Sequence, residues 1–232
     1  MSRDRVLATI RASLGCSEPE DEERVAAVER RLAAPLRHLI PACASRPHSE
    51  RVGQFTRSLR EQSAAVIEAA APGRIPEAIA RYLGEAGLPL RLKLGADPFL
   101  AALPWQETPA LERLQGPAGP GDAVALSSAG AGVAETGTLV LLSGRDNPTS
   151  LAFLPETHII AVAEAAIVGS FEDAFDRVRA RLGRGAMPRS LNLVSGPSRT
   201  GDIGGRIVLG AHGPRRLAVI VYKTDEGAVG AP

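Results

Sequence analysis

The stretch that decides the fold covers residues 158–182 and reads HIIAVAEAAIVGSFEDAFDRVRARL. Its first part, 158–163, is a nearly continuous apolar run, which is typical of a strand covered on both faces of its sheet. Its second part predicts a helix, because Ser170 can cap the start and Asp173 falls at the third helical position. The apolar residues that follow recur at helical spacing and form one stripe: Phe171, Ala174, Phe175, Val178 and Leu182.

Four more short apolar runs lie on either side of this stretch and predict strands at 122–126, 138–142, 191–194 and 217–222. Strand, helix and strand in succession imply right-handed crossover connections. The sequence therefore predicts an α/β fold class: a mostly parallel sheet with flanking helices.

The first third of the chain reads as helix. Apolar residues at helical spacing precede Gly15, which is a natural helix stop, and recur over 25–32. A third helix is expected to have Ser49 as its N-cap and to continue through Val66, and a shorter helix covers 76–87.

These patterns divide the chain into an N-terminal helical region, residues 1–72, and an α/β domain, residues 73–232, unless the two form one continuous domain. Within the second part, the segment 103–121 is rich in proline and glycine and is expected to be a long connection or lid. Trp105 within it either pins the segment to the core or lines a pocket.

Composition excludes several classes of function. A net charge of +1 does not favour nucleic acid or an anionic membrane as a partner, and 3% aromatic residues argue against a stacking platform for single strands. Cys16 and Cys43 form no paired motif, so we expect no metal site and no iron–sulfur cluster in this chain. The start of the chain is charged and is not a signal peptide, and no apolar run has the length of a membrane span. The expected location is the cytoplasm.

The first candidate motif, SSAGAGVAETGT at 127–138, joins two predicted strands. Its small residues allow close approach to a ligand, but its three glycines do not match the dinucleotide fingerprint. Glu135 is the only charged residue there and can act as a catalytic base or nucleophile, or can hold a turn through backbone N–H groups. Thr136 and Thr138 beside it are candidate ligand contacts.

The second motif, SGPSRTGDIGG at 195–205, follows a predicted strand. It lacks the lysine of a nucleotide-triphosphate loop, and its residues instead suggest an anion cradle. Ser198, Arg199 and Thr200 are the candidate anion-binding residues. Asp202 either contributes to the ligand site, pairs with Arg199 or caps the following segment.

Two histidines are candidate site residues. His212 stands between glycines in a loop, and its ordinary pKa suits proton transfer, which makes it a second catalytic candidate beside Glu135. His158, at the start of an apolar strand, is either a satisfied core residue or a ligand contact.

Taken together, the motifs resemble the LUD-domain family, and in particular its lactate-utilisation protein C type. The resemblance covers about residues 127–222 and rests on the strings at 134–138, 154–158, 196–203 and 210–214. It implies the fold shared by ribose-phosphate isomerase, glucosamine-phosphate deaminase and CoA-transferases (the NagB/RpiA/CoA-transferase-like fold).

The resemblance also implies a role in the oxidation of L-lactate to pyruvate, with two partner proteins that carry the iron–sulfur clusters and the oxidoreductase function. This chain would then be the subunit or accessory protein without clusters, with no cofactor of its own and a site for a small anionic ligand. Two alternatives remain: a stand-alone enzyme acting on a sugar phosphate, CoA thioester or folate-like substrate, and a non-catalytic scaffold domain.

Overall fold

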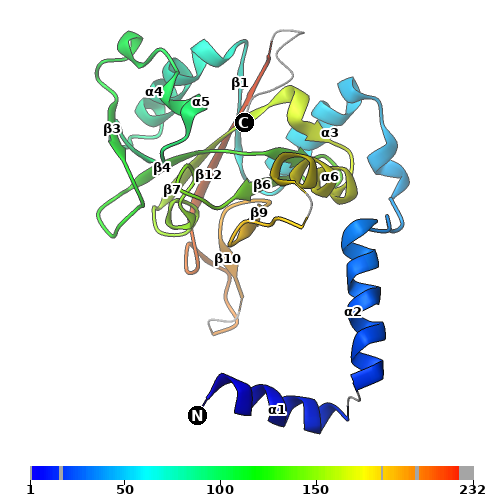
Figure 1. Cartoon of the computed structure of the whole chain (residues 1–232). Coiled ribbons are helices and arrows are strands. Elements are labelled where there is room, and N and C mark those ends of the chain that lie inside the picture. Colours follow the sequence, from blue (N-terminus) through cyan, green and yellow to red (C-terminus); the bar gives the residue numbers. More distant parts are fainter. Residues whose placement is uncertain (1, 16–17, 184, 202–203, 225–232) are drawn as a thin grey trace.

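The computed structural model describes residues 2–15, 18–183, 185–201 and 204–224. At its centre is a sheet of six strands that all run parallel (Figure 1). Across the sheet the strands are β1 (Ala65–Ala69), β12 (Arg216–Tyr222), β7 (Thr157–Ala163), β4 (Val124–Ser128), β2 (Arg91–Leu94) and β3 (Glu112–Gln115). The predicted fold class, α/β with a mostly parallel sheet and flanking helices, is confirmed.

Both faces of this sheet are covered, which explains why its central strands read as continuous apolar runs. One face packs against α4 (Ile75–Glu85), α5 (Pro98–Ala101) and a 3-10 helix at Trp105–Glu107. The other face packs against α3 (His48–Glu61) and a second sheet.

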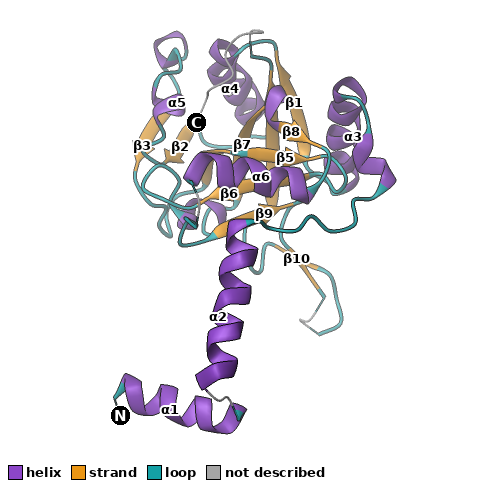
Figure 2. Cartoon of the chain, turned by 45° about the vertical axis from the view of Figure 1, so that its right-hand side comes forward, coloured by secondary structure: helices purple, strands orange, loops and turns teal. Residues whose placement is uncertain are grey.

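The second sheet has four strands in the order β8 (Ile167–Val168), β5 (Ala131–Val133), β6 (Thr138–Leu142) and β9 (Leu191–Val194). Two of the strands predicted from apolar runs, 138–142 and 191–194, therefore belong to this sheet, where they pair antiparallel. Helix α6 (Phe171–Leu182) packs against its outer face (Figure 2). Shorter elements are β10 (Arg199–Thr200), β11 (Val208–Leu209) and 3-10 helices at Ala42–Ser45, Pro72–Arg74, Thr149–Ala152 and Glu164–Ala166.

Helix α6 begins as its sequence predicts. The Ser170 hydroxyl accepts a hydrogen bond from the Asp173 backbone N–H, and the Asp173 carboxylate accepts one from the Ser170 backbone N–H, each at 3.2 Å. This reciprocal capping box satisfies two N–H groups that the helix cannot pair itself, and such a cap stabilises a helix by about 1 kcal/mol.

Two helices, α1 (Arg3–Leu14) and α2 (Glu18–Ala33), form an arm that extends away from the two sheets (Figures 1 and 2). Helix α1 ends where predicted, at Gly15, which adopts a left-handed conformation with φ 64°. It has no buried residue, and apolar side chains of both helices are exposed. In the described part of the chain, the arm included, no helix combines the length and apolar character needed to cross a membrane.

The expected third helix is wrong in its bounds. Helix α3 begins at His48 with Pro47, not Ser49, at the N-cap, and it ends at Glu61. Ser63 then adopts a left-handed conformation with φ 66°, which turns the chain into β1. Val66 therefore lies in the edge strand of the central sheet rather than on the helix. The division of the chain at residues 72 and 73 falls just after β1 and stays a prediction.

The expectation of an irregular connection over 103–121 is also wrong. This segment contains a 3-10 helix and β3, which pairs with β2 at the edge of the sheet. Trp105 takes the packing role: it is buried, and its Nε1–H donates a hydrogen bond to the Leu100 carbonyl at 2.7 Å.

Candidate functional site

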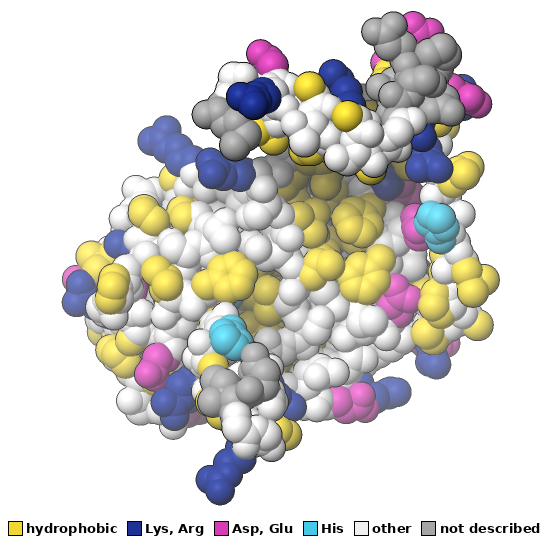
Figure 3. Space-filling view, turned by 90° about the horizontal axis from the view of Figure 1, so that it is seen from below, with side chains coloured by type: hydrophobic (Ala, Val, Ile, Leu, Met, Phe, Trp, Pro, Cys, Tyr) yellow, Lys and Arg dark blue, Asp and Glu magenta, His cyan; other side chains and the backbone are white. Residues whose placement is uncertain are grey.

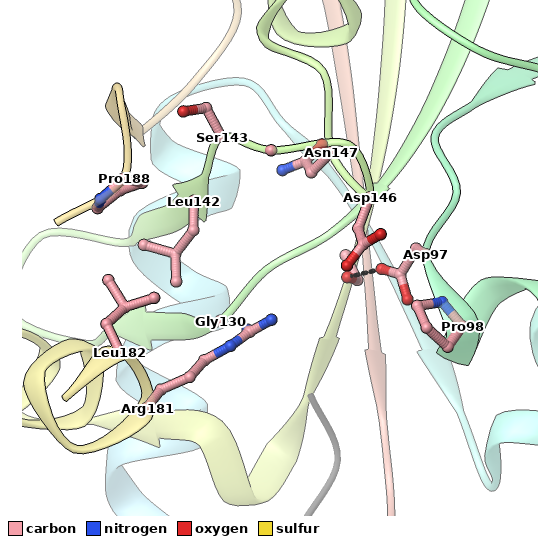
Figure 4. Close-up of a pocket in the computed structure, with 12 residues that line it drawn as sticks. Asp97, Pro98, Gly130, Leu142, Ser143, Asp146, Asn147, Arg181, Leu182 and Pro188 are labelled. Carbon is pink, nitrogen blue, oxygen red and sulfur yellow. Dashed lines mark hydrogen bonds between the residues drawn. The ribbon is translucent and has the colours of Figure 1, made fainter. Parts of the chain in front are cut away.

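A cleft opens at the carboxyl ends of β2 and β4, where the connections of the parallel sheet diverge. The chain leaves β2 toward β3 and leaves β4 toward the second sheet and β7. Such a switch point is where α/β sheets place their ligands. The cavity there encloses about 120 Å³, and we call it the switch-point cleft (Figure 4). Its polar and charged lining residues are Asp97, Ser128, Ser143, Asp146, Asn147 and Arg181.

Asp97 is the best-anchored group of the cleft. It is only 4% exposed, and its Oδ1 caps helix α5 by accepting the backbone N–H groups of Phe99 at 2.9 Å and Leu100 at 3.4 Å. Its Oδ2 accepts a hydrogen bond from the Ser128 hydroxyl at the end of β4 (Figure 4). The buried carboxylate is therefore satisfied by three donors, as a buried charge requires.

The negative charge of Asp97 acts on its surroundings. Tyr222, at the carboxyl end of β12, stacks on Phe99 with ring centroids 5.1 Å apart. Burial and, to a smaller extent, the Asp97 charge raise the pKa of Tyr222 to about 12. The phenol therefore stays protonated at every physiological pH.

A glycine brings the loop at 144–148 against the end of β2. The Ala96 backbone N–H donates to the Arg145 carbonyl at 3.3 Å. A Cβ on Gly95 would lie 1.9 Å from the Asp146 carbonyl oxygen, so only glycine fits there. This contact places Asp146 and Asn147 on the wall of the cleft, close to Asp97 (Figure 4).

Arg181 enters the cleft from the last turn of α6. Its guanidinium points into the cavity, from the opposite side to Asp97 (Figure 4). Its Nη1 lies beside Gly130, where a Cβ would be 3.7 Å away, an ordinary van der Waals contact. Arg181 forms no hydrogen bond or ion pair with any residue that the structure describes. It is the one basic side chain among the described residues of the lining.

The residues that the sequence predicts as a site lie elsewhere and fall into separate groups. Glu135, in the turn between β5 and β6, accepts a hydrogen bond from the Phe171 backbone N–H at 3.0 Å. The carboxylate thus faces the N-terminus of α6. This contact corresponds to the alternative in which Glu135 holds a turn through backbone N–H groups. Its predicted catalytic role stays a prediction.

The two threonines beside Glu135 belong to a second group. The Thr136 and Thr138 hydroxyls lie 2.7 Å apart, and Thr138 continues to the Ser195 hydroxyl at 2.7 Å. Arg199 lies near this group, because its Nη2 donates to the carbonyl of Gln62 at the end of α3, and Gln62 also touches the position of a Cβ on Gly196. Hydroxyls and an arginine thus lie near one another here, but the predicted anion-binding role of Ser198, Arg199 and Thr200 stays a prediction.

A third group joins the loops before β12. The His212 backbone N–H donates to the Ser198 hydroxyl at 3.2 Å, and the His212 side chain lines an open hollow of about 520 Å³ with Phe153, Leu154 and Glu156. Thr200 lies in β10, which pairs with β11. Asp202 lies outside the described residues.

His158 is a core residue. It is 1% exposed, its Nε2 lies 2.9 Å from the Ser127 hydroxyl, and burial lowers its pKa to about 3. The ring is therefore neutral at physiological pH and already has a partner.

Ser128 and Gly130 of the first motif line the switch-point cleft, but none of the individual candidate site residues that the sequence singles out does. The signals that point to it are a carboxylate followed by proline, Asp97–Pro98, directly after a short strand, and an arginine at the end of the best-defined helix. The described residues hold no cluster of three or more histidine, cysteine, aspartate or glutamate side chains arranged for a metal ion.

Comparison with known proteins gives a consistent result. The LUD domain model matches residues 52–222. Lactate utilization protein C of Bacillus subtilis is 38% identical over 90 residues, which is 38% of each chain, and that of Macrococcus caseolyticus is 29% identical over 175 residues, 75% of this chain and 72% of that protein. The alignments with curated relatives such as the Bacillus subtilis protein thus span only about two-fifths of the length of those relatives. A crystal structure of a DUF162 family protein from Deinococcus radiodurans superposes with a TM-score of 0.59 and 27% identity, over 76% of this chain and 99% of that one.

Proposed function

The chain belongs to the LUD-domain family, and from this premise we propose that it serves lactate utilisation. Specifically, it is the subunit or accessory protein without iron–sulfur clusters in a system that oxidises L-lactate to pyruvate. Its relatives named lactate utilization protein C support the pathway. The family resemblance recognised in the motifs is confirmed, and the finer role is the part that needs a test.

One observation indicates where the ligand of this system would bind. The Arg181 guanidinium points into the switch-point cleft and has no partner among the described residues. A planar guanidinium binds a carboxylate through two parallel hydrogen bonds, which makes it the natural holder of a small organic acid. We propose that the anionic ligand binds here.

The size of the cleft agrees with this ligand. A cavity of roughly 150 Å³ in another protein accommodates benzene, which has six heavy atoms. The cleft encloses about 120 Å³, and lactate also has six heavy atoms. The volume of the cleft therefore matches a ligand of about this size.

The arm offers a surface for the partner subunits. Val25, Val28 and Leu32 of α2 recur at helical spacing and are each more than half exposed, and Leu14 of α1 is 68% exposed. Figure 3 shows the face from which the arm extends, with hydrophobic side chains on the arm and across the body beneath it. Exposed apolar surface of this extent marks interaction sites. We propose that the iron–sulfur and oxidoreductase partners dock on this face.

The ligand proposal is tested by thermal unfolding with L-lactate. A ligand that binds only the folded state at 100 times its Kd stabilises it by about 2.7 kcal/mol, so Tm should rise. The Arg181→Gln variant should lose this rise. Arg177→Gln is the matched control, because Arg177 is an exposed arginine of the same helix that does not line the cleft. An equal lactate response in all three proteins would exclude Arg181 as the carboxylate holder.

The role in the pathway is tested by reconstitution. L-lactate oxidation is measured with the partner subunits alone, with the full chain added and with Arg181→Gln added. We expect full activity only with the unaltered chain. Activity that is the same without this protein would reject the role as a required subunit. Full activity with Arg181→Gln would leave the scaffold function instead.

A further inference from the structure

We propose that the switch-point cleft selects a 2-hydroxy acid over the corresponding 2-oxo acid, and that Ser128, oriented by Asp97, is the residue that makes the choice. The inference rests on the proposed function, because it assumes that a small carboxylic acid sits against Arg181. It goes further by saying which oxidation state of that acid the site holds, and why.

The argument starts with the single proton of the Ser128 hydroxyl. A serine hydroxyl has one proton to donate and two lone pairs that accept, whereas an ionised carboxylate only accepts. Because Ser128 is hydrogen-bonded to Asp97 Oδ2, the serine must be the donor in that contact. Its proton is then committed, and only its lone pairs remain for a ligand.

Asp97 cannot easily turn away and release that proton. Its Oδ1 is fixed by the two backbone N–H groups at the start of α5, and the side chain is 4% exposed. Rotation of the carboxylate would break the cap of α5 and leave a buried charge without its donors. The direction of the Ser128–Asp97 hydrogen bond is therefore part of the framework of the cleft.

The cleft thus has two chemically different sides (Figure 4). Arg181 on one side only donates, and it suits the carboxylate of the ligand. Ser128, which is hydrogen-bonded to Asp97 on the other side, only accepts, and Asp146, which also lines the cleft, is a second group that only accepts when ionised. A 2-hydroxy acid complements this pattern, because its carboxylate accepts and its hydroxyl donates.

A 2-oxo acid does not complement it. Held by the same arginine, it would place its carbonyl oxygen, an acceptor, against the lone pairs of Ser128 and the carboxylate of Asp146. The carbonyl oxygen then gains no hydrogen bond where the lactate hydroxyl gains one, which weakens pyruvate binding by roughly tenfold relative to lactate. Ser143 and Asn147 do not impose this choice, because a hydroxyl and an amide can both donate and accept.

The test compares L-lactate with pyruvate by isothermal titration calorimetry on the full chain. We expect the unaltered protein to bind lactate at least about tenfold more tightly than pyruvate. Ser128→Ala should narrow the difference between the two affinities, because it removes one of the two acceptors and leaves Arg181 and Asp146 in place. Asp97→Asn should weaken or reverse the preference, because a side-chain amide at this position can donate to Ser128 and leave the serine proton for the ligand.

Two controls separate the possible results. Ser143→Ala should keep the preference for lactate, since the Ser143 hydroxyl accepts from the Ser190 backbone N–H and is not committed to a carboxylate of the described residues. Asparagine caps helices as well as aspartate does, so Asp97→Asn should keep the fold, which circular dichroism verifies. Equal binding of lactate and pyruvate by the unaltered protein, or an unchanged preference in Ser128→Ala, overturns this inference alone. Binding of neither acid overturns it together with the ligand site of the proposed function.

Discussion

His158 predicts a measurable sensitivity of the fold to acid. In the folded chain its pKa is about 3 because the ring is buried, whereas an exposed histidine in the unfolded chain has a pKa near 6.5. Above pH 6.5 the ring is neutral in both states and contributes no pH dependence. As the pH falls from 6.5 toward 3, the unfolded chain binds a proton that the folded chain does not, so the fold loses stability.

The magnitude follows from the difference between the two pKa values. Each pH unit below 6.5 costs about 1.4 kcal/mol, so at pH 5 this one residue lowers the free energy of unfolding by roughly 2 kcal/mol. The free energy of unfolding of a domain is typically about 5–15 kcal/mol, so this loss is on the order of a fifth of the total.

The assay is urea unfolding at pH 7 and pH 5, for the unaltered chain and for His158→Gln. Glutamine can keep a hydrogen bond to Ser127 but does not titrate. We expect the unaltered chain to lose roughly 2 kcal/mol more than the variant between the two pH values. His38→Gln, which removes an exposed histidine, should behave as the unaltered chain. An equal loss in His158→Gln would mean that His158 takes up its proton in the folded state, and it would return this residue to the candidate ligand contacts.

Three further predictions concern close contacts and hydrogen bonds within the fold. Gly95→Ala should displace the loop that carries Asp146, because the new Cβ would lie 1.9 Å from its carbonyl oxygen, and should abolish lactate binding by calorimetry. Gly84→Ala, in α4 and outside the cleft, has nothing within 4 Å and should leave binding intact. Glu135→Ala should lower the free energy of urea unfolding by about 1 kcal/mol, because the carboxylate holds the first turn of α6. A lactate-oxidising activity that disappears in Glu135→Gln while stability is kept would instead support the catalytic role. Trp105→Phe should lower the free energy of unfolding by about 1 to 3 kcal/mol in the same urea assay, because it leaves the buried Leu100 carbonyl without its donor. An unchanged free energy of unfolding would show that water replaces the indole N–H.

The parts of the fold that the sequence predicts are those with strong local signals. Burial on both faces makes β7 and β12 nearly pure apolar runs, and the reciprocal bonds of Ser170 and Asp173 mark the start of α6. These features depend only on residues close together in the sequence, so periodicity and capping chemistry are enough to locate them.

The errors occur where the signal is weak or non-local. Val66 stands seven residues after Leu59, which fits helical spacing, and the turn between them is made by Ser63 in a left-handed conformation. Glycine or asparagine would have indicated such a turn, but serine does not. Strand β3 was hidden because it is an exposed edge strand, whose sequence ERLQ has little apolar character.

The switch-point cleft could not be read from the sequence for a different reason. Asp97 and Arg181 are 84 positions apart, and they line one cleft only because β2 and α6 end beside it. Asp97 also has a sufficient local explanation, as the cap of α5. Arg181 is one of many arginines in an arginine-rich chain, and an exposed arginine on an amphipathic helix normally faces solvent. Its significance comes from the absence of a partner among the described residues, which only the three-dimensional structure shows.

The motifs that identify the family have a structural meaning of their own. Gly137, with φ 66°, would place a Cβ 2.8 Å from the Ser58 side chain, and Gly196 would place one 3.0 Å from the Gln62 side chain. Both neighbours lie at the end of α3, so these glycines let the second sheet and its loops close onto that helix. Small residues at such contacts are required by packing whether or not a ligand binds nearby. The family motifs therefore report how the two sheets and α3 fit together, whereas packing does not account for the charge that Arg181 directs into the cleft. For this reason the Arg181→Gln and Ser128→Ala variants bear most directly on what the protein does.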